Sequence, residues 1–180
     1  MSKIQLASRI LSVCFKFFCW FIPLITIYLI LFKLPKLLDM STFVLMMPAV
    51  HIDKAMQFSL LHRLIILTIQ FLPLSITIMI CYKLAKLFRL YAEGKLFEQI
   101  NIKLIKSISV YMIVGQVIQL IYQPLITAAL TFTNPPGQRI ASITLGSANV
   151  STLITAMVIL VASWIVKEAN QLKLDAQLTI

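Results

Sequence analysis

The apolar residues of this sequence gather in four long runs that short polar segments separate. The runs lie at about 10–32, 64–82, 107–132 and 145–166, and each contains at least 19 residues. A helix of about 20 apolar residues is long enough to cross the hydrocarbon core of a bilayer. Only Lys16 interrupts the first run, and its long stem lets the charge reach the membrane surface. The pattern therefore predicts four transmembrane helices.

Composition supports this interpretation. Of 180 residues, 60% are apolar and 12% are charged, whereas soluble domains average about 45–50% apolar and about 25% charged residues. Such a chain cannot bury its apolar surface in one small soluble core, so lipid must solvate much of it. We expect an all-α fold, a polytopic membrane helical bundle with four transmembrane helices that forms a single domain over residues 1–180.

Lys and Arg outnumber Asp and Glu by 16 to 6, which gives a net charge of +10. In a soluble protein this charge would suggest nucleic acid, but here most charges lie outside the apolar runs. There they set the topology and attract anionic headgroups, so we expect lipid contact and no direct nucleic-acid binding. Eleven Lys and Arg lie in the two termini and the central connection, against five in the other two connections. The positive-inside rule places both termini and the central connection in the cytoplasm.

The central connection, called the hinge below (83–106), mixes basic and apolar residues in a way typical of an amphipathic helical hairpin at the membrane surface. Gly94 is the only hinge residue that readily adopts a positive φ. We therefore expect the second span to continue as helix to about Ala92 and to end there, with Phe97 anchoring the next helix. A basic turn held to anionic lipid is the simpler interpretation of this segment, and a binding site is the alternative.

The segment after the fourth run, called the tail below (167–180), predicts a short amphipathic helix. Leu172, Leu178 and Ile180 are unusual residues to leave in water, so we expect them to dock on the hinge or on another protein. The candidate partner-binding residues of the hinge and the tail are Arg89, Tyr91, Gly94, Phe97, Asn101, Glu168, Leu172, Leu178 and Ile180.

Two short motifs in these segments resemble a known family. They are Tyr91, Gly94, Phe97 and Asn101 after the second span, and Trp164, Glu168, Leu172, Leu178, Thr179 and Ile180 after the fourth. The pattern is similar to domain-of-unknown-function family 2975, a family of small bacterial four-span membrane proteins, which implies a location in the bacterial cytoplasmic (inner) membrane. Members are often encoded beside a small helix-turn-helix transcription factor of the Xre type, so the resemblance implies such a regulator as a partner. The tail is less acidic at 174–177 than the family pattern.

The third run carries a polar face. Gln116, Gln119 and Gln123 lie at offsets of 0, 3 and 7, which places them on one side of a helix. Buried amides at membrane depth need partners, so this face should point into the bundle. Hydrogen bonding between helices is the simpler role, and a substrate or ion path is the alternative.

The fourth run carries a stripe of small residues that predicts a close helix contact. It consists of Ser147, Ser151 and Thr155, with Ala148, Thr152 and Ala156 beside them.

We expect no enzymatic activity, no cofactor and no metal site. No charged residue lies at the middle of a span, and the sequence contains no nucleophile elbow, phosphate-binding glycine loop or carboxylate pair. His51, Asp53 and His62 are three possible zinc ligands in the connection 33–63, but their spacing matches no standard site. That connection is itself unusually apolar. We expect it to fold back over the bundle as a cap, and the alternatives are that it lies in the membrane interface or meets a partner.

These observations support two hypotheses from different functional classes. The first is a non-enzymatic membrane regulator or anchor that binds a protein partner at its cytoplasmic face. The second is a small transporter or channel-like subunit that uses the glutamine face of the third span, as a homo-oligomer, since four helices enclose only a thin pore. Substitutions in the hinge and tail should impair the first function, whereas substitutions of the glutamines should impair the second.

Overall fold

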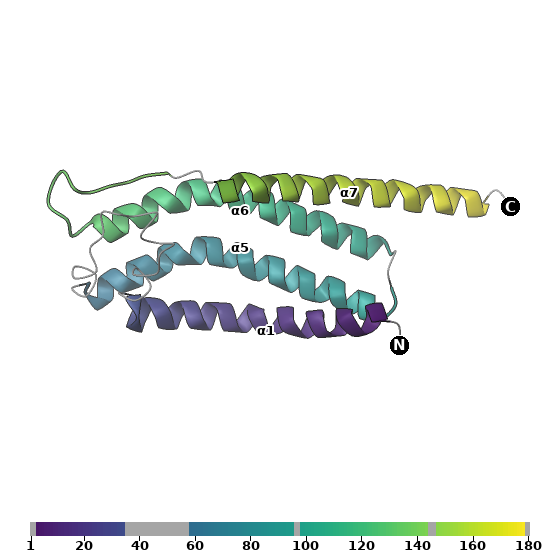
Figure 1. The fold of residues 1–180 in the computed structure, drawn as a ribbon, viewed down its shortest axis with the longest axis horizontal. Helices are drawn as coiled ribbons and strands as arrows, with labels where there is room; N and C mark the ends of the chain where they lie inside the picture. Colours follow the sequence, from purple (N-terminus) through teal and green to yellow (C-terminus); the bar gives the residue numbers. More distant parts are fainter. Residues whose placement is uncertain (1–2, 35–57, 96–97, 144–146, 179–180) are drawn as a thin grey trace. The chain divides into compact units, whose positions relative to one another are not determined.

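The fold consists of four long helices. The computed structural model describes residues 3–34, 58–95, 98–143 and 147–178, with the side chains of 147–148 and 172–178 excepted. The helices are α1 (Lys3–Phe32), α5 (Leu60–Ala92), α6 (Gln99–Thr131) and α7 (Ser147–Leu178), shown in Figure 1. No strand occurs in these described ranges. The all-α prediction is therefore confirmed.

All four helices are long and apolar enough to cross a membrane. The mean hydropathy of their most apolar windows ranges from 1.7 to 2.3, yet only 6–17% of these windows is buried inside the protein. Large apolar side chains such as Trp20 and Leu60 are instead exposed. Because such a surface is stable in lipid and not in water, this chain is a multi-pass membrane protein.

The helices extend beyond the predicted spans. With 33 residues, α5 is about 50 Å long, whereas the hydrocarbon core is about 30 Å thick. The excess lies mainly at the basic end, where α5 continues past Tyr82 through Lys83, Lys86 and Arg89 to Ala92. The second span and the first arm of the hinge are thus one continuous helix, as expected.

The chain divides into two compact units, each described here by itself. The first contains Met1–Trp20, Ile76–Gln116 and Ser147–Ile180, and the second contains Phe21–Ser75 and Val117–Gly146. Helices α1, α5 and α6 contribute to both units. This division does not test the expectation of a single domain, which stays a prediction.

In the first unit, the core joins the two arms of the hinge. Leu87 and Leu90 of α5 are buried with Leu104 and Ile108 of α6. These residues recur at intervals of three and four, so each helix presents one apolar side to the other. Apolar packing therefore holds the helical hairpin together near the turn.

In the second unit, polar side chains supplement an apolar cluster. The cluster consists of Ile30, Leu34, Phe58, Ile66, Leu67, Ile126 and Leu130. The Tyr122 hydroxyl donates to Gln70 Oε1 at 2.6 Å, and His62 Nε2 lies 2.7 Å from the Ala129 carbonyl oxygen. Arg63 donates to the Leu31 carbonyl. These bonds connect α5 to α6 and to α1.

The segment after α6 is held to that helix by two threonines. The backbone N–H groups of Ile140 and Ser142 donate to the hydroxyls of Thr131 and Thr127, at 3.0 and 3.1 Å. The connection between α1 and α5 lies largely at 35–57, outside the described residues, so its role as a cap stays a prediction. Phe58, which follows it, is buried in the cluster of this unit.

Candidate functional site

The hinge turns through a Schellman motif at the end of α5. Gly94 has a φ of +83°, and its N–H donates to the Tyr91 carbonyl at 3.1 Å. The next residue, Lys95, donates from its N–H to the Leu90 carbonyl at 3.0 Å. This pair of bonds requires a left-handed residue, and glycine adopts that conformation without a steric penalty from Cβ. The prediction of a chain reversal at Gly94 is confirmed.

Asn101 fixes the other side of the turn. Its side chain is 1% exposed, and its Nδ2 donates to the carbonyl oxygen of Lys95. A buried amide without such a bond would destabilise the fold by about 1–3 kcal/mol. Its Oδ1 has no hydrogen-bond partner among the described residues. The backbone just past Gly94 is therefore tied to the first turn of α6.

Aromatic contacts connect the hinge to α1. Tyr91 is half-buried and lies edge-to-face with Phe88, whose ring stacks on Phe15 of α1 with centroids 5.7 Å apart. Nearby, the Ser12 hydroxyl donates to the Ala85 carbonyl at 2.9 Å, and Ser12 is buried. The basic end of α5 is thereby packed against both α6 and α1.

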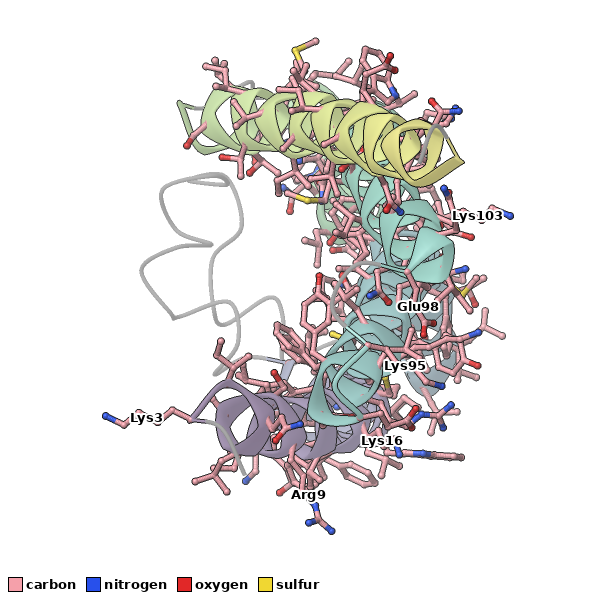
Figure 2. All side chains as sticks on the ribbon, turned by 90° about the vertical axis from the view of Figure 1, so that its right-hand side faces the viewer. Lys3, Arg9, Lys16, Lys95, Glu98 and Lys103 are labelled. Atoms are coloured by element: carbon pink, nitrogen blue, oxygen red, sulfur yellow. The ribbon has the colours of Figure 1, made fainter. Side chains whose placement is uncertain are left out.

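Most charged residues of the hinge are exposed, whereas Lys83 and Lys86 are half-buried. Glu93 lies 3.7 Å from Arg89 and 3.5 Å from Lys95, and about half of each of these three side chains is exposed. Such exposed pairs stabilise a protein by about 1 kcal/mol or less, so their charges remain available for binding. Figure 2 views this end of the first unit, where Lys3, Arg9, Lys16, Lys95, Glu98 and Lys103 are labelled.

A comparison with protein families gives the affiliation of the chain. The family model described as "Protein of unknown function (DUF2975)" matches residues 47–180. The chain belongs to this family. The match includes α5, α6, α7 and the hinge but does not include α1. Comparisons with curated proteins and with solved structures found no match.

In this DUF2975 member, the hinge accounts for part of the predicted site. Arg89, Tyr91, Gly94 and Asn101 lie together at the turn. Glu168 is exposed on α7, which continues as one helix through the predicted tail to Leu178. The remaining members of the predicted site are Phe97 and Ile180, which lie outside the described residues, and Leu172 and Leu178, whose side chains do. Docking of the tail on the hinge therefore stays a prediction.

The glutamine face of α6 is half-buried. Gln116 ends the first unit's part of α6, whereas Gln119 and Gln123 belong to the second unit. Gln123 interacts with another residue. The side-chain amides of Gln116 and Gln119, in contrast, form no hydrogen bond with other described residues. The expected role in bonding between helices is therefore not observed for these two side chains within the described part of the chain.

The small-residue stripe of α7 is buried on one of its two sides. Ala156 is fully buried and Thr152 is half-buried, but Ser151 and Thr155 are exposed. The buried side continues to Ser163, which is seven residues after Ala156 and thus on the same side of the helix. Close packing of α7 therefore depends on the Ala156 side of the stripe.

Several polar contacts were missed because their partners are far apart in sequence. Gln70 is a polar residue within an apolar run, which indicates that its side chain needs a hydrogen-bond partner. That partner is the Tyr122 hydroxyl. His62, considered above as a zinc ligand, instead bonds to a backbone carbonyl and stacks on Phe58 with centroids 4.4 Å apart. His51 and Asp53 lie outside the described residues. Within the described ranges, no three His, Cys, Asp or Glu side chains are arranged to hold a metal.

Proposed function

We propose that this protein is a non-enzymatic membrane regulator or anchor that binds a protein partner through its hinge and tail. The proposal includes its setting in the bacterial inner membrane, with the termini and the hinge in the cytoplasm. The distribution of Lys and Arg supports this orientation, because the side with more basic residues tends to remain inside.

The proposal rests on a contrast within the hinge. Its backbone is held by hydrogen bonds and a buried side chain, whereas charged side chains are exposed on its surface. Hydrogen bonds at Gly94 and from Asn101 fix the end of α5 and the backbone of Lys95, while the side chains of Lys95 and Glu98 are exposed beside them. A surface that is ordered before binding loses less conformational entropy when a partner binds.

The chemistry of the surface indicates the kind of partner. The hinge offers mainly positive charge, and the tail adds apolar residues at 172, 174 and 178. A soluble protein with an acidic rim around an apolar groove would complement both features. The resemblance to the family makes a helix-turn-helix transcription factor the first candidate.

Site-specific photocrosslinking in living cells tests this proposal. A photoreactive residue at position 95, on the hinge, should form an adduct with one cytoplasmic protein. The same residue at position 138, which is exposed in the α6–α7 connection, is the control and should not form that adduct. Adducts with lipid alone at position 95, or the same protein at both positions, would contradict the proposal.

A second candidate function is supported by the glutamines of α6. Half-buried amides without partners are costly at membrane depth, and Gln116 and Gln119 have none among the described residues. A second copy of the chain or a permeating solute would supply the missing bonds. Loss of uptake of a solute in a Gln119→Leu variant that inserts normally would favour this transporter or channel-like function.

A further inference from the structure

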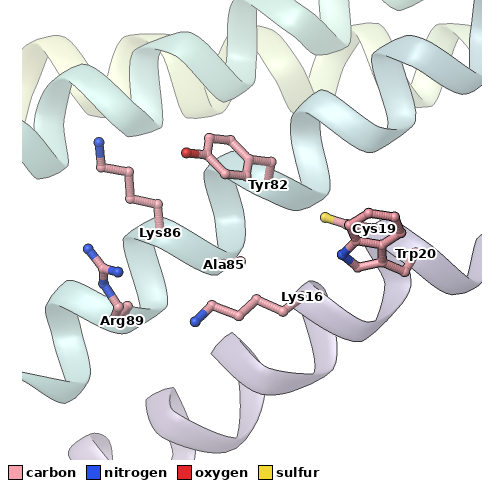
Figure 3. Close-up of a pocket in the computed structure, with 7 residues that line it drawn as sticks. All are labelled: Lys16, Cys19, Trp20, Tyr82, Ala85, Lys86 and Arg89. Carbon is pink, nitrogen blue, oxygen red and sulfur yellow. The ribbon is translucent and has the colours of Figure 1, made fainter.

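A cavity of about 330 Å³ lies between α1 and α5 in the first unit. It is lined by Lys16, Cys19, Trp20, Tyr82, Ala85, Lys86 and Arg89 (Figure 3). A second cavity of about 470 Å³ shares Lys16 and Arg89 with it and adds Arg9 and Glu93. The two cavities share this basic wall, and together they are lined by four cationic side chains and one carboxylate.

The positive charges of the first cavity are not balanced by carboxylates among the residues that line it. Neither Lys16 nor Lys86 forms an ion pair with another described residue. Arg89 Nε is 3.7 Å from Glu93 Oε1, which is longer than a hydrogen bond, and the Arg89 side chain is 57% exposed. Lys16, Lys86 and Arg89 place three positive charges around one cavity, so an anion bound there would reduce their mutual repulsion.

The other side of the cavity is apolar and aromatic. Trp20 is 77% exposed and Tyr82 is 56% exposed, and both line the cavity on the side away from Arg89 (Figure 3). In sequence, uncharged runs begin directly after Lys16 and end directly before Lys83. The cavity therefore lies where the charged segments meet the membrane-spanning segments, a level at which Trp and Tyr are enriched.

Contacts between α1 and α5 hold the two walls of the cavity in place. The Ser12–Ala85 hydrogen bond and the stacked rings of Phe15 and Phe88 lie beside its basic end. Toward the apolar end, Cys19 Sγ lies 3.9 Å from the Ile78 carbonyl oxygen. The cavity is thus formed by the packing of the helices and does not depend on a ligand.

We propose that this cavity is a specific binding site for the phosphate headgroup of an anionic phospholipid. Lys16, Lys86 and Arg89 contact the phosphate, and Trp20 and Tyr82 contact the glycerol and the first part of the acyl chains. A free phosphate ion would use only the basic wall, so the aromatic wall favours a lipid as the source of the anion. Basic sites between helices at the membrane surface commonly recognise such headgroups.

The test uses the purified full chain in a neutral detergent, so that no protein partner is present and the outcome is independent of the proposed function. Native mass spectrometry measures retention of phosphatidylglycerol, with phosphatidylcholine and inorganic phosphate as comparison ligands. The test variant is Lys16→Gln/Lys86→Gln. The control is Lys103→Gln/Lys106→Gln, which removes the same charge at two exposed positions of α6 outside both cavities.

The parent protein should bind phosphatidylglycerol in preference to phosphatidylcholine, and inorganic phosphate should not displace it. Affinity for phosphatidylglycerol should fall roughly tenfold to thirtyfold in the test variant, because each surface cation contributes about 1 kcal/mol. The control should bind as the parent does, and Lys16→Arg/Lys86→Arg should retain binding, which separates lost charge from lost folding.

Three outcomes would overturn the proposal. Equal losses in the test and control variants would mean that only total charge matters. Displacement by inorganic phosphate at similar concentrations would identify a free-anion site. Unchanged lipid binding in the test variant, combined with loss of the position-95 adduct in cells, would assign the cavity to an acidic segment of the protein partner.

Discussion

A valine at position 94 would have to adopt the φ of +83° that Gly94 now has. For a residue with a side chain, the left-handed region is unfavourable by about 1–2 kcal/mol, because Cβ approaches the following carbonyl oxygen. Contact with the surroundings adds little, since a Cβ here would lie 3.4 Å from Gln5 Nε2, an ordinary van der Waals distance. Up to Cβ, the strain therefore comes from the backbone conformation.

This strain should open the Schellman turn without affecting insertion of the spans. A free-energy change of 1–2 kcal/mol corresponds to a roughly fivefold to thirtyfold larger population of the open turn. When opening is fast relative to cleavage, the rate of proteolysis follows that population. Trypsin should therefore cut after Lys95 about five to thirty times faster in Gly94→Val than in the parent. If the tail docks on the hinge, cleavage after Lys173 should also accelerate.

Two further variants make this experiment decisive. Gly137 also has a positive φ, of +90°, and no atom lies within 4 Å of a Cβ there. Gly137→Val introduces the same strain in the other connection and should leave cleavage after Lys95 unchanged. Gly94→Asn should behave more like the parent, because asparagine tolerates the left-handed region. The reasoning is refuted if Gly94→Val is cut no faster than Gly137→Val, or if asparagine is as disruptive as valine.

Three other predictions follow from the helices. Ala156→Leu should destabilise the protein by about 1–3 kcal/mol because Ala156 is fully buried. Thr155→Leu changes an exposed position and should not destabilise the protein. Equal thermal unfolding temperatures of the two variants in detergent would contradict this packing. Gln119→Leu should change stability by about 1 kcal/mol or less, measured in the same way, and a larger loss would show that Gln119 has a partner. In a variant without native cysteines, a cysteine at Ser2 should be labelled only in opened cells and one at Gln138 from outside, and labelling of Ser2 in intact cells would reverse the orientation.

The membrane-spanning fold and the hinge turn could be predicted from sequence because their causes are local. Transfer of an apolar segment into lipid depends on the length and composition of that segment. The reversal at Gly94 depends on the φ preference of one residue, and the helix does end at Ala92. Hydropathy alone did not show how far the helices continue past the hydrocarbon. It detects only the apolar span, whereas the continuation at the membrane surface is amphipathic.

Contacts between distant segments were decided only by the tertiary structure. Ser12 and Ala85 are 73 residues apart, His62 and Ala129 are 67 apart, and Tyr122 and Gln70 are 52 apart. Periodicity identifies an apolar or polar side of a helix, but it does not indicate which other helix covers that side. The small-residue stripe of α7 illustrates this, since adjacent positions differ by about 100° around a helix axis.

The proposed lipid-binding cavity shows the same division between local and distant causes. The sequence by itself determined that Lys16 and Lys86 lie near the ends of apolar runs, because charge is excluded from hydrocarbon. It left the two lysines 70 positions apart on separate helices. Only the packing of α1 against α5 brings them, with Arg89 and Trp20, around one cavity. That packing arises from contacts along both helices, and none of these contacts exists within either segment alone.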